Sequence, residues 1–277
     1  MKICVSMWSL HREFFQGRMD VVDFIKWTGT TAAEGVELLD VFWKDQAREI
    51  PAVKAALAEA NLTVGCYAVS NNFVTDAAAR AEQVEIIRRG VDMAVEFGAP
   101  VVRVFAGDLA EDISFDDARQ WIIDGLREAA AYAAEHRITL SLENHGKLAG
   151  RSDQIIGILK DVGSDYLKAT VDLGNFLLVD EDPAAAVTNL APYAAHVHFK
   201  DFRPYREGDS QSYQALSGQR FVGTIAGEGG VDLKHALTEL KAASYQGWLS
   251  VEFEGLEDEK LGTIQSVNNL VDTLEVL

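Results

Sequence analysis

Short apolar runs alternate with longer stretches of helical periodicity along the whole chain, and this alternation predicts parallel strands joined by helices. The predicted strands cover residues 3–8, 35–38, 63–69, 101–105, 139–143, 169–172, 195–199 and 248–253. The predicted helices cover residues 20–28, 46–60, 77–97, 115–136, 154–162, 233–243 and 260–274. Eight such units predict a single (β/α)8 TIM barrel over residues 1–277.

An open, doubly wound sheet is the alternative fold that the same alternation allows. Such a sheet usually carries a glycine-rich phosphate turn after its first strand, and residues 6–11 (SMWSLH) contain no glycine. No linker rich in proline, glycine or serine divides the chain, so we expect one domain. The one long irregular stretch, at about 202–230, is expected to be a loop before the last strand.

Polar and apolar residues alternate inside several of the predicted strands. In residues 139–143 (TLSLE) the polar side chains share one face and the leucines the other, because side chains alternate along a strand. The pattern recurs in 169–172, 196–199 and 249–252. Helices cover the outside of an α/β barrel, so the polar set points inward, where it costs free energy unless it is paired. Charges that converge at the C-terminal ends of the strands indicate an active site.

Four chemically related residues end four successive predicted strands: Glu143, Asp172, His198 and Glu252. Three carboxylates in one cavity repel one another unless one is protonated or a cation lies between them. Three carboxylates with one imidazole suit a single divalent ion such as Mn²⁺, Mg²⁺, Co²⁺ or Zn²⁺. The alternative is a buried polar cluster in which Arg103 is the counter-charge.

Five short motifs follow one another in order: GVEL at 35–38, SLENHG at 141–146, DLGN at 172–175, HVHFKD at 196–201 and VE at 251–252. Together they resemble the xylose-isomerase-like barrel superfamily, which includes sugar isomerases and epimerases, inosose dehydratases and dehydroshikimate dehydratases. The resemblance implies that Glu143, Asp172, His198 and Glu252 bind one metal ion, with Mn²⁺ preferred. It also implies that Glu143 and Glu252 exchange protons with the substrate.

One chemical scheme covers the reactions that this resemblance implies. A metal ion on the carbonyl and adjacent hydroxyl of a keto sugar polarises the C=O bond, and a carboxylate then removes the acidified proton. Returning that proton to the other carbon isomerises the sugar, returning it to the opposite face epimerises it, and expelling a β-hydroxyl dehydrates it. All three reactions share an enediolate.

The favoured prediction is an isomerase or epimerase of a small keto or aldo sugar or a related polyol. The alternative is a dehydratase or lyase acting on an inosose, a dehydroshikimate-like acid or a keto-glycoside. A third hypothesis is a barrel without catalytic activity that binds a sugar or a partner subunit.

Asn175 departs from two groups within the superfamily. Endonuclease IV, a DNA-repair enzyme with a zinc cluster, has a metal-binding histidine at this position, and the ketose 3-epimerases have a substrate-binding histidine there. This difference disfavours both of these groups and leaves the isomerases, dehydratases and lyases of the superfamily as the better candidates. The net charge of −18, from 25 basic and 43 acidic residues, also disfavours DNA and anionic membranes, which attract clustered Lys and Arg. We expect neither nucleic acid nor membrane as a partner.

Several further residues at the expected mouth are candidates for substrate binding: His145, Lys200, Glu37, Arg103, Asn175 and Arg203. Lys200 can bind an anionic group or form an ion pair with a mouth carboxylate. Glu37 can bind substrate hydroxyls or pair with Arg103. Arg203 can clamp a phosphate or carboxylate, and the alternative is a solvated loop arginine. Three aromatic residues near strand ends can stack on a sugar or pack the mouth: Trp8, Phe73 and Phe105.

The remaining features concern location and assembly. The N-terminal sequence lacks the length and cleavage site of a signal peptide, and no stretch approaches about 18 continuous apolar residues. We therefore expect a cytoplasmic protein. The oligomeric state stays open, with a homo-oligomer as one outcome, because barrels of this type often associate through the loop face or the outer helices.

Overall fold

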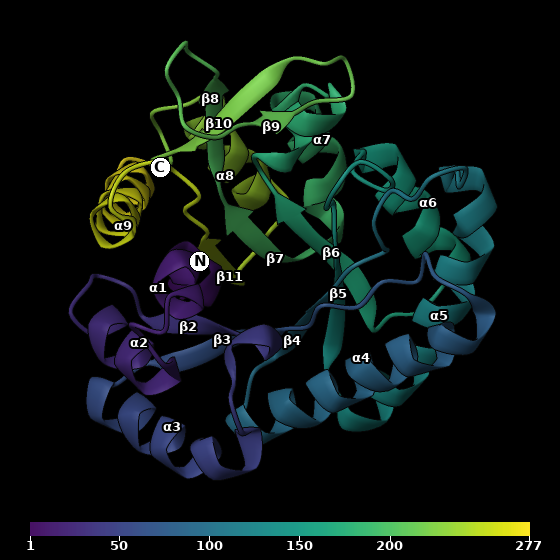
Figure 1. Ribbon diagram of the computed structural model, residues 1–277, viewed down its shortest axis with the longest axis horizontal. Helices are drawn as coiled ribbons and strands as arrows, with labels where there is room; N and C mark the ends of the chain where they lie inside the picture. The colour runs from purple at the N-terminus through teal and green to yellow at the C-terminus, as the bar shows by residue number, and fades with distance from the viewer.

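Eight parallel strands close into a barrel in the computed structural model, which describes residues 1–277 (Figure 1). The strands are β1 (Lys2–Ser6), β2 (Gly35–Leu39), β3 (Thr63–Ala68), β4 (Val101–Val104), β5 (Thr139–Glu143), β6 (Leu167–Asp172), β7 (Ala194–Phe199) and β11 (Trp248–Val251). Their order around the barrel is β1-β11-β7-β6-β5-β4-β3-β2, and β1 pairs with both β11 and β2. The predicted (β/α)8 fold is confirmed.

Helices surround the barrel on its outside, except for the short α1 (His11–Phe15), which lies at its mouth (Figure 1). They are α1 (His11–Phe15), α2 (Val21–Thr28), α3 (Gln46–Ala60), α4 (Ala77–Phe97), α5 (Phe115–His136), α6 (Ser152–Val162), α7 (Pro183–Leu190), α8 (Leu233–Ala242) and α9 (Glu259–Glu275). Four 3-10 helices are η1 (Met7–Leu10), η2 (Asp40–Phe42), η3 (Asn175–Val179) and η4 (Ala191–Tyr193). Asp20 and Ser114 begin α2 and α5 with capping boxes that satisfy the free N–H groups of the first turn. None of these helices combines the length and the apolar character needed to cross a bilayer.

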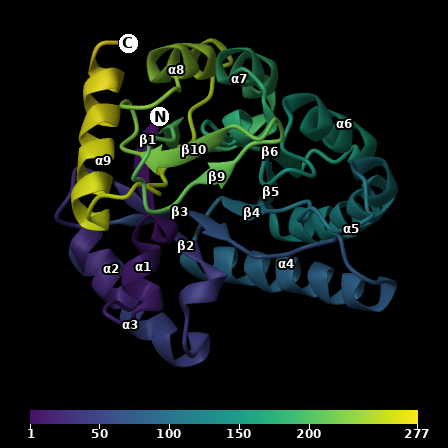
Figure 2. The ribbon, with the colours of Figure 1, turned by 45° about the horizontal axis from the view of Figure 1, so that its top comes forward.

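The stretch 202–230 is more ordered than the sequence suggested. It contributes to a small antiparallel sheet of β8 (Asp201–Pro204), β10 (Arg220–Thr224) and β9 (Tyr213–Gln214), which lies between α9 and α7 in both views (Figures 1 and 2). The Asp201 carboxylate accepts hydrogen bonds from the backbone N–H groups of Gly227, Gly229 and Val231 at 2.9–3.1 Å. These strands take up 10 of the 29 residues of the stretch, so the expected long loop is interrupted by short strands.

Helix α7 was missed in the sequence prediction. It is only eight residues long, and Pro183 stands in its first turn. Proline is tolerated there because the first N–H groups of a helix have no partner within it. The Asp182 side chain caps the same turn by accepting from Ala184 and Ala185.

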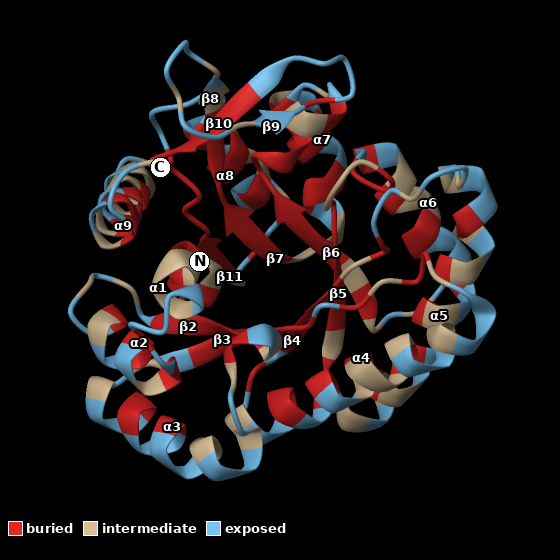
Figure 3. Cartoon of the chain, in the orientation of Figure 1, coloured by how far each residue is buried: buried red, intermediate tan, exposed pale blue.

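The apolar core lies between the outer face of the barrel and the helices. Figure 3 shows the barrel strands as buried and the helices as part buried and part exposed. Leu140 and Leu142 of β5 are fully buried in this core. The intervening Ser141 accepts a 2.7 Å hydrogen bond from the Thr170 hydroxyl of β6 instead. Neighbouring strands thus bring their polar side chains to one another on the face opposite the leucines.

Candidate metal centre and substrate cavity

The four predicted metal ligands meet at the C-terminal end of the barrel. Glu143 and Asp172 are the last residues of β5 and β6, His198 is the penultimate residue of β7, and Glu252 directly follows β11. Their ligand atoms lie within 4.8 Å of one another, and all four residues are buried. The Nδ1 atom of His198 is 3.5 Å from Glu143 Oε2 and 3.6 Å from both Asp172 Oδ2 and Glu252 Oε2.

The arrangement of these atoms fits a divalent metal ion. Asp172 Oδ1 accepts from the backbone N–H groups of Gly174 and Asn175, whereas His198 Nδ1 is buried without a hydrogen-bond partner and Asp172 Oδ2 has only the Lys200 ammonium beside it, at 3.1 Å. Buried polar atoms are normally fully paired, so ligand atoms that are aimed at one point and lack hydrogen bonds indicate a bound ion. Atoms bound at about 2.1 Å to one ion are about 3.0–3.5 Å apart, close to the separations seen here. Oxygen and imidazole donors suit a hard or borderline ion.

The charge balance of the centre also favours a cation. Two permanently charged bases, Arg103 and Lys200, are buried there. The carboxylates buried around them are Glu37, Glu143, Asp172, Glu252 and Glu254. In the state that binds metal, with His198 neutral and every carboxylate ionised, five negative and two positive charges leave three negative charges without a counter-charge. Unpaired buried charge is costly, and a divalent ion would compensate most of it.

Glu37 orients His198 from beneath the centre. Its carboxylate accepts from His198 Nε2 at 3.1 Å and from His196 Nε2 at 2.9 Å, and all three side chains are fully buried. A proton on Nε2 of His198 leaves Nδ1 free to bind metal, as in other carboxylate–histidine–metal arrangements. Glu37 neither lines the cavity nor pairs with Arg103. Substrate in the cavity has no access to it, which departs from the substrate-binding role predicted for Glu37.

Glu143 is held as an anion by its neighbours. Arg103 Nε lies 3.3 Å from Glu143 Oε2, and Asn175 Nδ2 donates to Glu143 Oε1 at 3.2 Å. Burial alone would raise the pKa of Glu143, but His198 and Arg103 outweigh it and lower the pKa well below its ordinary value. The Arg103 guanidinium also stacks over the Phe105 ring at 3.9 Å, so the guanidinium has a fixed position.

Glu252 has the opposite electrostatic environment. Burial raises the pKa of Glu252 to about 7, even though Lys200 and His198 act to lower it. Lys200 Nζ donates to Glu252 Oε2 at 2.6 Å and lies 3.1 Å from Asp172 Oδ2. Two carboxylates with pKa values displaced in opposite directions form an arrangement typical of an acid and a base acting on one substrate.

Glu254 belongs to the site but was missed by the sequence reasoning. Its Oε1 atom accepts from Trp8 Nε1 at 2.7 Å and from Lys200 Nζ at 3.3 Å. The available signal was the position of Glu254 two residues after Glu252, because side chains two apart in an extended chain share a face.

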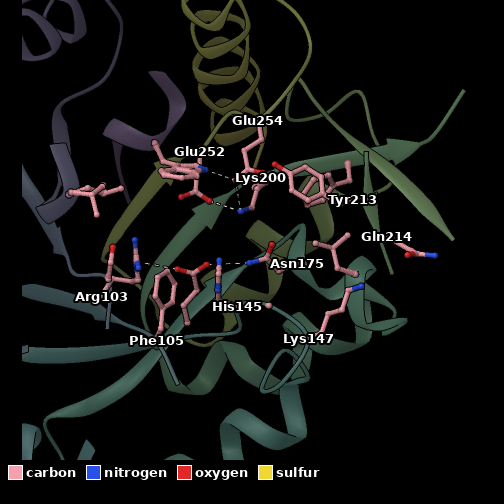
Figure 4. Close-up of a pocket in the computed structure, with 18 of the residues that line it drawn as sticks. Arg103, Phe105, His145, Lys147, Asn175, Lys200, Tyr213, Gln214, Glu252 and Glu254 are labelled. Atoms are coloured by element: carbon pink, nitrogen blue, oxygen red, sulfur yellow. Dashed lines mark hydrogen bonds and ion pairs between the residues drawn. The ribbon is translucent and has the colours of Figure 1, made fainter. Parts of the chain in front are cut away.

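A cavity of about 770 Å³ opens above the centre (Figure 4). Of the predicted substrate-binding residues, it is lined by Arg103, His145, Asn175 and Lys200. Trp8 and Phe105 also line it, whereas Phe73 is fully buried in the core. The His145 ring lies against the Phe105 ring, with 4.1 Å between centroids.

Arg203 lies outside the cavity. Its guanidinium donates two hydrogen bonds to the carboxylate of Asp209, at 2.8 and 2.9 Å. The local ion pair occupies the groups that were expected to clamp an anionic substrate. The structure therefore assigns Arg203 a contact within the loop in place of the predicted contact with substrate.

A family model described as the xylose isomerase-like TIM barrel matches residues 23–273. The chain belongs to this family. Among curated members, the rhizopine catabolism protein MocC of Rhizobium meliloti is 31% identical over 134 residues, which cover 47% of this chain and 41% of that protein. The L-ribulose-5-phosphate 3-epimerase UlaE of Salmonella heidelberg (strain SL476) is 24% identical over 236 residues, or 83% of this chain and 77% of the epimerase.

An inosose dehydratase of Geobacillus thermodenitrificans (strain NG80-2) is 28% identical over 139 residues, covering 48% of this chain and 46% of the dehydratase. This xylose isomerase-like barrel thus spans less than half of two of these relatives and about three quarters of the third. Since the relatives include both an epimerase and a dehydratase, family membership indicates an enzyme without fixing the reaction.

Solved structures show the same fold. A D-tagatose 3-epimerase-like protein superposes with a TM-score of 0.80 at 20% identity, covering 100% of this chain and 98% of that chain. A xylose isomerase-like TIM barrel protein from Mycobacterium smegmatis, solved in complex with magnesium, gives a TM-score of 0.79 at 16% identity and covers 99% and 97% of the two chains.

Proposed function

We propose that this protein is a divalent-metal-dependent isomerase or epimerase of a small keto or aldo sugar or a related polyol carbonyl compound, acting through an enediolate. The observation that carries the proposal is the convergence of the buried side chains of Glu143, Asp172, His198 and Glu252 next to a cavity that Glu143 and Glu252 line. Mn²⁺ is the proposed ion, with Mg²⁺, Co²⁺ and Zn²⁺ as alternatives. When bound, the ion polarises the substrate carbonyl and acidifies the adjacent C–H bond.

Glu143 and Glu252 are the proposed acid–base pair. They come from β5 and β11, which are separated in the barrel by β6 and β7, so they approach the floor of the cavity from different directions. Arg103 and Asn175 keep Glu143 anionic and fixed in position, ready to accept a proton. Glu252 lies on the other side of the floor and is the proposed group that returns the proton from the other direction. We assign Asp172 and His198 to metal binding alone.

The other cavity residues are proposed to bind substrate. The Lys200 ammonium lies beside Glu252 and Asp172, so it can stabilise negative charge that develops on a substrate oxygen bound next to these carboxylates. His145 and Arg103 present polar groups on the Phe105 side of the cavity. A small carbohydrate-like substrate is therefore the proposed partner. The expected absence of nucleic acid and membrane partners and the expected cytoplasmic location stay predictions.

A dehydratase or lyase is the second candidate, and Lys200 with Glu254 favours it. Expulsion of a β-hydroxyl requires an acid near the leaving oxygen in addition to the base that takes the C–H proton. The Lys200 ammonium contacts Glu252 and Glu254 within the cavity and provides such an acid. An inosose, a dehydroshikimate-like acid or a keto-glycoside remains the proposed substrate for this reaction.

Two measurements test these proposals. Metal content by mass spectrometry, after reconstitution with Mn²⁺, is expected to be about one ion per chain in the wild type. It should be much lower in Glu143→Ala, Asp172→Ala, His198→Ala and Glu252→Ala. Glu96→Gln, which removes an exposed carboxylate on α4, is the control and should retain the ion. No metal in the wild type, or full metal content in all four variants, would contradict the metal-dependent mechanism.

Proton NMR of candidate sugars in D₂O then separates the two reactions. Exchange of a C–H proton for deuterium without loss of water supports the isomerase or epimerase. An unsaturated product supports the dehydratase. A metal-loaded protein that does neither with keto sugars, aldo sugars or inososes would favour the third hypothesis, a barrel that binds a sugar or a partner subunit.

A further inference from the structure

The cavity has an apolar wall beside its polar floor. The apolar wall consists of Trp8, Phe15, Leu39, Val41 and Phe105. The cavity volume of about 770 Å³ lies in the upper part of the range of about 300–1,000 Å³ that is typical of sites for drug-sized ligands. A single sugar is much smaller than such ligands. A sugar bound at the charged floor would therefore leave the apolar wall uncovered.

Exposed apolar side chains are concentrated at the mouth of this cavity. Phe15 is 66% exposed and Val41 is 48% exposed, and Tyr213 on the opposite β9 strand is also exposed. A group of exposed apolar residues around a concave site, in contrast to scattered single ones, indicates a place where ligand is bound. These three residues come from α1, η2 and β9, so only the folded barrel brings them to one opening.

Trp8 connects the apolar wall to the proposed catalytic residues. Its Nε1 atom donates to Glu254, which also accepts from Lys200. The Trp8 ring stacks on His11 with 5.0 Å between centroids and lies 6.1 Å from Phe15 in an edge-on contact. The indole is therefore held in place, and a ligand at the charged floor has the aromatic wall as its next neighbour.

The cavity offers little to a phosphate group. Arg103 and Lys200 are already paired with buried carboxylates, and Arg203 is outside the cavity in an ion pair with Asp209. Lys147 is the one other lysine or arginine that lines the cavity. A bound dianion would also face the anionic floor, so charge disfavours a sugar phosphate.

We propose that the substrate is a glycoside-like compound whose keto-sugar unit lies over the metal centre and whose uncharged ring substituent packs on Trp8, Phe15 and Val41. The substituent is an aromatic ring or a second sugar ring, because both present an apolar face to an aromatic wall. This inference rests on the proposed function, since it places the sugar at the same floor. It adds a second subsite and excludes phosphorylated sugars as the preferred class.

Titration calorimetry on the Mn²⁺-reconstituted protein tests the second subsite. The probes are methyl, phenyl and glucosyl keto-β-D-glucosides, in which one ring hydroxyl is replaced by the carbonyl that the metal centre needs, with glucose 6-phosphate as the charged comparison. Burial of a ring on the apolar wall should make the phenyl or the glucosyl compound bind at least tenfold more tightly than the methyl compound. Tighter phenyl binding identifies an aromatic substituent, and tighter glucosyl binding identifies a second sugar.

Phe15→Ala and Val41→Ala should each reduce that preference several-fold, because each removes part of the apolar wall. Val95→Ala, which shortens a similarly exposed side chain on the distant α4, is the matched control and should change nothing. Circular dichroism confirms that each variant is folded.

Equal affinity for the methyl and ring-bearing compounds, or tighter binding of glucose 6-phosphate, would overturn the inference. Failure of the metal-loaded protein to bind any of the glucosides would overturn it as well. In each case the metal content and the D₂O exchange assay report separately on the proposed function, so the two failures are distinguishable.

Discussion

Replacing Glu37 with glutamine should weaken metal binding although Glu37 is not itself one of the four ligands. The two carboxylate oxygens of Glu37 each accept from one histidine, His198 at 3.1 Å and His196 at 2.9 Å. An amide has one acceptor oxygen and one NH₂ group, so one of the two Nε2–H groups would face another donor. The orientation of the His198 ring, or its proton on Nε2, would then no longer be fixed.

The expected loss of Mn²⁺ affinity is about 10- to 100-fold, the usual effect of removing a carboxylate that orients a ligand histidine, or about 1.4–2.7 kcal/mol. Titration calorimetry measures it directly. Glu259→Gln is the matched control, because Glu259 is also a buried carboxylate that accepts from backbone N–H groups but lies outside the cavity. An unchanged Mn²⁺ affinity in folded Glu37→Gln, equal to that of the control, would refute the assigned orientation of His198.

Three further outcomes follow from the site and the core. Burial lowers the pKa of His198, but the surrounding carboxylates outweigh burial and raise that pKa well above its ordinary value. His198 in the metal-free protein therefore carries a proton that the metal must displace, so the Mn²⁺ affinity measured by calorimetry should rise from pH 6 to pH 8. An affinity that does not change with pH would contradict this reasoning. Lys200→Met removes an ammonium 2.6 Å from Glu252, so Mn²⁺ should bind several-fold more tightly; weaker binding in a folded variant would show that Lys200 supports the centre. Gly125→Ala would place a methyl group against the Phe73 ring, so the free energy of unfolding from thermal denaturation should fall by about 1–3 kcal/mol. An unchanged melting temperature would mean that the Phe73 ring can shift to make room for the methyl group.

The alternation of polar and apolar residues was sufficient to predict the strands and the converging ligands. The alternation of polar and apolar residues in β5 predicted that Glu143 faces inward. The order of the strands predicted that Glu143 lies near Asp172 and His198, where the structure has it. The alternation alone allows an open sheet as well, so the prediction of closure rested on the number of units and on the absence of a glycine-rich turn after the first strand.

The contacts that depend on distant pairing could not be predicted in the same way. Glu37 and His198 are 161 residues apart, and no local pattern shows that the carboxylate lies beneath the imidazole and not in the cavity. The position of Arg203 depends on a nearby residue, because Asp209, six residues away, binds its guanidinium and holds it away from the cavity. The strand β9 has two residues, both exposed, so it lacks the apolar periodicity by which the other strands were found.

Because of the hydrogen bonds of Asp201, the segment that shapes one side of the cavity can change in sequence independently of the proposed metal centre. This residue follows the ligand strand β7 by two positions, and its carboxylate binds the backbone at Gly227, Gly229 and Val231, so both ends of the intervening segment are tied to one point. Insertions, deletions or substitutions between those ends, at Tyr213 for example, can reshape one side of the cavity without moving His198. A library restricted to this segment is therefore a route to new substrate preferences while the proposed metal centre stays unchanged.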